Sequence, residues 1–168
     1  MSWLGNVFRS KRGSRPASSG SSEARAELIA QVQFQAALEL AQRGDRHEAI
    51  AAFRLAAAAF RECGKRRGEA VCLHGEGAQH LLRGETDQAE QCTIRSLALH
   101  RACGDDEFIA PVVADLGAIV RRKGDLRQAI EYYTEALELY ERLSDDAEIE
   151  RCRKKIRKIE RDIKLTQV

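Results

Sequence analysis

The strongest constraint on the fold of this chain is a long internal repeat with a constant period. Gly44, Gly84 and Gly124 are equally spaced and set a period of about 40 residues. The same register holds Asp45, Glu85 and Asp125; Ala49, Ala89 and Ala129; and Glu48, Gln88 and Gln128, with weaker matches at Phe60, His100 and Tyr140, at Gly64 and Gly104, and at Gly77 and Gly117. A unit that recurs at a fixed period buries its apolar face by stacking on its neighbours, so this register predicts a repeat architecture of three units.

The residues that recur are those that begin and end helices. Glycine ends a helix because it adopts a left-handed conformation without steric cost. The acid that follows can cap the next helix, and a Glu or Gln three residues later completes a capping box. We therefore expect helices near residues 23–43, 46–62, 66–83, 86–102, 106–123, 126–142 and 145–164. Ser144 is the expected N-cap of the last helix, and Pro111 is expected in a first turn or at a small kink.

No pattern of residues in the sequence points to catalysis. There is no HExxH motif, no phosphate-binding glycine loop and no recognisable pair of nucleophile and base. The four histidines are scattered, and the pairs His100–Cys103 and Cys72–His74 do not supply the ligand count of a zinc site. His100 shares its register with Phe60 and Tyr140, which favours a packing role. The sequence predicts a protein that is not an enzyme and that binds no metal or cofactor.

The distribution of charged residues and cysteines indicates the cellular compartment of this protein. The formal net charge is +2, and four basic residues without an acid fall within residues 1–22. No apolar run is long enough to span a membrane, and the basic residues follow the short N-terminal apolar segment instead of preceding it, unlike a secretory signal. Five cysteines without a CxxC pair are typical of a reducing compartment. We expect a cytoplasmic protein, with contact to a membrane surface as the alternative.

The third repeat resembles the tetratricopeptide repeat in Leu116-Gly117, Gly124-Asp125, Ala129-Ile130, Tyr133 and Ala136-Leu137. In the first repeat Gly44-Asp45, Ala49-Ile50 and Phe53 match, whereas in the second Thr93 and Ser96 replace the aromatic residue and the alanine. The common repeat has about 34 residues. Because its period is longer, this chain is similar to the long-repeat branch found in kinesin light chains and spindle-orientation adaptors. The resemblance implies an all-α fold, a right-handed α-solenoid of three helix-turn-helix pairs at about residues 23–63, 64–103 and 104–143, with a capping helix at 144–168.

The resemblance also implies a function and a site. In this family the first helix of each pair lines a concave groove that binds a peptide or an amphipathic helix of another protein. Carried over to this sequence, the groove residues are Phe34, Leu38, Val71, His74, Ala78, Leu81, Arg121 and Arg122. The groove is then apolar at one end and basic at the other, as suits a scaffold or adaptor. The alternative is that the leucines belong to the core and the arginines are solvated.

Residues 1–22 form a basic N-terminal tail that we expect to be disordered, with Trp3, Leu4, Val7 and Phe8 at helical spacing. Three hypotheses stay open for this apolar segment. It inserts into an anionic membrane surface, it docks on a protein partner or a neighbouring copy, or it is a frayed terminus. The first of these gives the alternative function, a self-assembling scaffold recruited to a membrane.

The last helix combines an apolar stripe with basic faces. Its stripe consists of Ile149, Cys152, Ile156, Ile159 and Ile163. Terminal repeats need a capping helix for solubility, which is the main interpretation of this stripe. Coiled-coil pairing with a second copy is the alternative. The basic faces lack interleaved aromatic residues, so the pattern does not favour nucleic acid.

Overall fold

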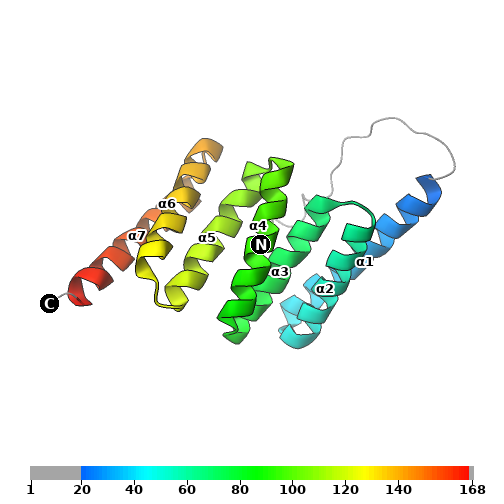
Figure 1. Cartoon of the computed structure of the whole chain (residues 1–168), viewed down its shortest axis with the longest axis horizontal. Helices are drawn as coiled ribbons and strands as arrows, with labels where there is room; N and C mark the ends of the chain where they lie inside the picture. The colour runs from blue at the N-terminus through cyan, green and yellow to red at the C-terminus, as the bar shows by residue number, and fades with distance from the viewer. Residues whose placement is uncertain (1–19, 167–168) are drawn as a thin grey trace.

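A computed structural model describes residues 20–166, and this part of the chain consists of helices without strands (Figure 1). The helices are α1 Gly20–Arg43, α2 Arg46–Glu62, α3 Arg66–Arg83, α4 Thr86–Cys103, α5 Asp106–Arg122, α6 Leu126–Leu143 and α7 Asp146–Thr166. They form a row in which each helix packs mainly against its neighbours in sequence. The predicted all-α solenoid of helical hairpins with a C-terminal capping helix is therefore confirmed. None of the described helices combines the length and apolarity that crossing a membrane requires.

The turns between helices recur at half the period of the sequence repeat, because each repeat contains two helices. Gly44, Gly64, Gly84, Gly104 and Gly124 all have positive φ, and Ser144 takes the sixth such position with φ 56°. In each turn, the residue that follows the positive-φ residue donates its N–H to the carbonyl five positions earlier, which is the Schellman bond. These bonds join Asp45 to Leu40, Lys65 to Phe60, Glu85 to His80, Asp105 to His100, Asp125 to Val120 and Asp145 to Tyr140.

The predicted helix caps are only partly present. The Asp125 carboxylate accepts a hydrogen bond from the Gln128 N–H at 2.9 Å, as a capping box requires, but Asp45 and Glu85 make no such side-chain bond. The prediction for Ser144 was wrong. Ser144 ends α6 in a left-handed conformation, and Asp145 caps α7 by accepting from the Glu148 N–H at 3.2 Å. The reason is that the Schellman turn places the left-handed residue one position before the cap.

Small residues allow adjacent helices to approach closely. A Cβ atom added at Gly68 would lie 2.5 Å from the ring of Phe60, and one at Gly117 would lie 3.0 Å from the ring of Tyr133. In the second repeat the polar replacements are buried and satisfied. Thr93 Oγ1 donates to the Ala89 carbonyl at 2.7 Å, and Ser96 Oγ donates to the Ala70 carbonyl at 2.8 Å. The second repeat therefore packs closely without the family's aromatic residue.

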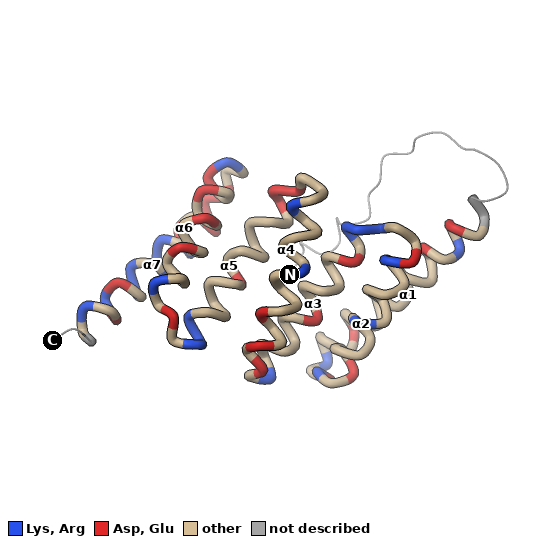
Figure 2. Tube along the Cα trace, viewed as in Figure 1, with Lys and Arg blue, Asp and Glu red and all other residues tan. Residues whose placement is uncertain are grey.

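The C-terminal helix α7 packs on the preceding helices through its apolar stripe. At the C-terminal end, Cys152 and Ile159 of α7 are fully buried against the preceding helices, and the other residues of the isoleucine stripe are half-buried. The stripe is thus used within the chain, while Lys and Arg recur along the rest of α7 (Figure 2). Pro111 is the sixth residue of α5 and so lies beyond the first turn, which leaves a small kink at this residue as the remaining prediction.

His100 has the packing role that its register predicted. Its ring is 1% exposed and stacks on Phe108 with the ring centroids 5.3 Å apart. Burial, together with the nearby His74, lowers the pKa of His100 to about 4. His100 therefore stays neutral in the folded chain at pH values where an exposed histidine takes up a proton.

Replacing Ser144 by glycine should stabilise the fold. A non-glycine residue in the left-handed region is strained, and glycine relieves that strain at the end of α6. We expect Ser144→Gly to raise the free energy of unfolding by about 0.5–1 kcal/mol. The reciprocal change, Gly124→Ser at the equivalent turn, should lower it by a similar amount. Urea unfolding followed by circular dichroism measures both; equal stability of Ser144→Gly and the wild type would contradict the strain argument.

The pH dependence of stability should contain a component from His100. Between pH about 6.5 and about 4 the unfolded chain binds a proton on this residue and the folded chain does not, so stability falls as the pH falls through this window. The full effect is on the order of 3 kcal/mol. His100→Phe, which copies Phe60, should lose this component. Unfolding curves of both chains at pH 7.5 and pH 4.5 give the difference, and parallel losses in the two chains would exclude His100 as the cause.

Candidate peptide-binding groove

A mainly apolar hollow lies between α1 and α3. It has a volume of about 850 Å³. Phe34, Leu38 and Ala41 are spaced by four and three residues, which places them on one face of α1. Val71, His74 and Ala78 have the same kind of spacing on α3. We call this hollow, lined by Phe34, Leu38, Ala41, Gln42, Phe53, Val71, His74, Gly75, Ala78, Gln79 and Asp115, the groove.

The floor of the groove is built from aromatic rings. Phe34 and Phe53 are almost fully buried, and their ring centroids lie 6.1 Å apart. The ring of Phe53 reaches the groove because Gly75 of α3 has no side chain. A Cβ atom at this position would lie 2.6 Å from that ring. The walls are formed by half-exposed residues such as Leu38 and Ala78, which leaves apolar surface in contact with solvent.

One end of the groove is polar and acidic. Asp115, on α5, has a side chain that is 46% exposed, and its Oδ2 lies 2.8 Å from His74 Nε2. This pair joins the second and third hairpins across the groove. Gln79 also lines it, and its buried Oε1 has no hydrogen-bond partner among the described residues. An acceptor of this kind is stabilised when a donor reaches it.

The structure brings together five of the eight residues predicted for the groove. Phe34, Leu38, Val71, His74 and Ala78 line the hollow.

The other three predicted residues lie outside the hollow. Leu81 is half-buried beyond it, and Arg121 and Arg122 are exposed. The Arg122 guanidinium donates to the carbonyl of Leu81. The charged groove residue of the third repeat is therefore the acid Asp115, where the sequence had suggested arginines. The apolar tail residues Trp3, Leu4, Val7 and Phe8 lie outside the described residues.

Phe53 and Asp115 are among the groove residues that were missed at the level of sequence. Phe53 matched the repeat pattern in the sequence, and in the structure it is buried and also forms the floor of the groove. Asp115 was not considered, although its charge stands out in α5, whose other charged residues lie at the two ends of the helix (Figure 2). A single charge within an apolar stretch of helix could have predicted a functional position, because such a charge needs a partner or contact with solvent.

A second group of side chains lies on the opposite side of α3. Glu76, His80 and Cys92 are the one set of three or more metal-ligating side chains in the described segment whose ligand atoms lie close together. They line a separate hollow of about 330 Å³ between α2, α3 and α4. Two residues along a helix correspond to a rotation of about 200°, so His74 and Glu76 face opposite sides.

A row of helical hairpins with an open groove defines the chain as an α-solenoid repeat protein. Residues 73–142 match the family model described as tetratricopeptide repeat. The crystal structure of BtubC (BKLC) from P. vanneervenii is similar with a TM-score of 0.63 and 14% identity, covering 96% of this chain and 72% of that one. A Podosopora anserina protein described as a putative kinesin light chain with nearly identical TPR-like repeats has a TM-score of 0.51 and 10% identity, covering 84% of this chain and 89% of that one.

These comparisons identify tetratricopeptide repeats in residues 73–142 and the fold of the described chain. At such low identities the two structures are evidence for the fold alone, and a comparison with curated proteins finds no significant match. The sequence match shows tetratricopeptide repeats at residues 73–142, which confirms the resemblance predicted from the third repeat, and the similar structures extend the fold alone to the rest of the described chain.

Proposed function

We propose that this protein is an adaptor that binds an apolar segment of a partner protein in the groove between α1 and α3. Tetratricopeptide repeats generally mediate interactions between proteins. The observation that carries the proposal is the hollow of about 850 Å³, which collects apolar side chains from three helices and leaves them open to solvent. Open apolar hollows with a few polar groups are the usual form of a binding site.

The shape and chemistry of the groove favour a particular kind of partner. Leu38, Ala41 and Ala78 offer surface to one or two apolar anchor residues on an amphipathic helix or an extended segment. Asp115 offers a carboxylate to a lysine or arginine of that segment. This reverses the polarity expected from the arginines of α5, because those arginines lie outside the groove.

The proposal predicts the effect of charge placed in the groove. Selection of a random-peptide phage library on the full chain should yield peptides with an apolar anchor and a basic residue. Leu38→Glu and Ala78→Glu should weaken these peptides about tenfold or more, because each buries a charge against the apolar anchor. Asp115→Asn should weaken mainly peptides that carry the basic residue. Fluorescence polarisation with labelled peptides gives the dissociation constants.

Leu55→Glu is the matched control, because Leu55 is 62% exposed on α2 and does not line the groove. It should leave the affinity unchanged. Circular dichroism checks that each variant keeps its helicity. If the selected peptides bind Leu38→Glu and Ala78→Glu as tightly as the wild type, the groove is not their binding surface.

A further inference from the structure

The side of α3 that faces away from the groove carries a buried group of three different metal-ligating residues. Glu76 and His80 are four residues apart on α3 and therefore lie on one face, and Cys92 reaches the same point from α4. All three are less than one-tenth exposed. One ligand atom from each lies within 4.8 Å of the other two. Thiolate, imidazole and carboxylate are the three groups that proteins use to bind Zn²⁺.

The distance between His80 and Glu76 suits a shared ion better than a direct hydrogen bond, whereas Cys92 is close enough to Glu76 for its thiol to donate a hydrogen bond to the carboxylate. His80 Nε2 and Glu76 Oε1 lie 3.7 Å apart, which is too long for a hydrogen bond. Two ligands of one tetrahedral zinc ion are separated by about 3.4–3.6 Å, given metal–ligand bonds of about 2.0–2.3 Å. Small side-chain rotations therefore suffice to bring the three atoms around one ion.

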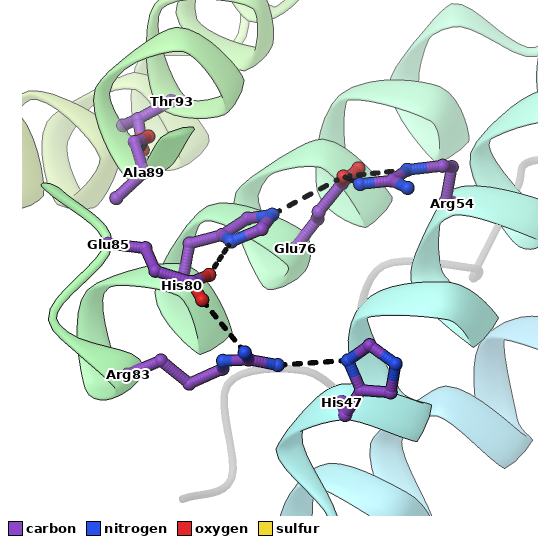
Figure 3. A network of polar contacts seen from close by, with 8 residues as sticks. All are labelled: His47, Arg54, Glu76, His80, Arg83, Glu85, Ala89 and Thr93. Carbon is purple, nitrogen blue, oxygen red and sulfur yellow. Dashed lines mark hydrogen bonds and ion pairs between the residues drawn. The ribbon is translucent and has the colours of Figure 1, made fainter. Parts of the chain in front are cut away.

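The surroundings already hold His80 in the orientation that a metal ligand needs. Its Nδ1 lies 2.6 Å from Oε2 of Glu85, and Figure 3 shows the ring between Glu85 and Glu76. A proton on Nδ1 that is donated to Glu85 leaves the lone pair of Nε2 directed toward Glu76. This carboxylate–histidine pair is the usual outer-shell arrangement of zinc-binding histidines. Arg83 in turn contacts Glu85 at 2.8 Å, which holds the carboxylate in place.

A guanidinium orients the carboxylate of the group, and the adjoining hollow has room for a fourth ligand. Arg54 donates from Nε and Nη2 to Oε1 of Glu76, at 3.0 and 2.7 Å, and so orients the carboxylate. The three residues also line the hollow of about 330 Å³, which can hold a water molecule as the fourth ligand. Burial and the charge of Glu76 raise the pKa of the Cys92 thiol to about 11. A bound cation compensates this effect, and the thiol proton leaves to solvent.

We propose that Glu76, His80 and Cys92 bind a zinc ion, with a fourth position open to the hollow. The ion joins α3 to α4 behind the groove. This proposal does not depend on peptide binding in the groove, because the two sites occupy opposite faces of α3.

The test uses the full chain after treatment with a chelator and dialysis. Titration calorimetry with Zn²⁺ should show one ion bound per chain. Co²⁺ should give a thiolate-to-cobalt charge-transfer band in the near ultraviolet. Cys92→Ser should abolish that band, and both Cys92→Ser and His80→Ala should weaken Zn²⁺ binding by about tenfold or more.

Cys152→Ser is the matched control, because Cys152 is equally buried but lies on α7. It should leave both the band and the Zn²⁺ affinity unchanged. The proposal is overturned if the wild-type chain shows no saturable Zn²⁺ binding and no cobalt band, or if the band persists in Cys92→Ser. The absence of a cobalt band in the wild-type chain overturns the proposal even if a variant fails to fold, since the band reports thiolate ligation directly.

Discussion

The left-handed residue that ends each helix is the constraint on which the rest of this structure depends. Gly44, Gly64, Gly84, Gly104 and Gly124, with Ser144, reverse the chain at equal intervals. Because each reversal is closed by the same Schellman bond, successive hairpins have the same geometry and stack in a row. The residues Phe60, His100 and Tyr140 supply the backbone carbonyls of three of these bonds, and their side chains are buried at the same place in each repeat, which accounts for large rings recurring there.

The sequence predicted the helices well because their ends are determined by local chemistry. Glycine, the following residue and the apolar periodicity act within a few residues of one another. The groove was harder to predict, because an error of one position turns a side chain by about 100°. Leu38 and Val71 lie in the hollow as expected, whereas Asp115 takes the place given to Arg121. The Glu76–His80–Cys92 group has no sequence signature. Cys92 comes close to the other two residues only because α4 packs on α3 in this particular alignment.

Helix α3 gives the molecule two chemically different faces. Toward α1 it presents Val71, Ala78 and a bare glycine backbone, which keep the groove apolar and open. Away from the groove it presents Glu76 and His80, which are buried and joined to charged residues of neighbouring segments. A substitution on one face therefore changes partner recognition, while a substitution on the other changes how the second hairpin is held together. The second hairpin departs most from the family pattern, because buried polar side chains stand where the family has an aromatic residue and an alanine.

The packing of each helix mainly against its sequence neighbours has a consequence for how the chain folds. Most contacts close short loops, so little chain entropy is lost before a hairpin gains its buried surface. Any hairpin can serve as the starting point, and the neighbouring hairpins then add on either side. In the described row α1 and α7 have a neighbour on one side only, so we expect these two helices to open at a lower free energy than the central ones.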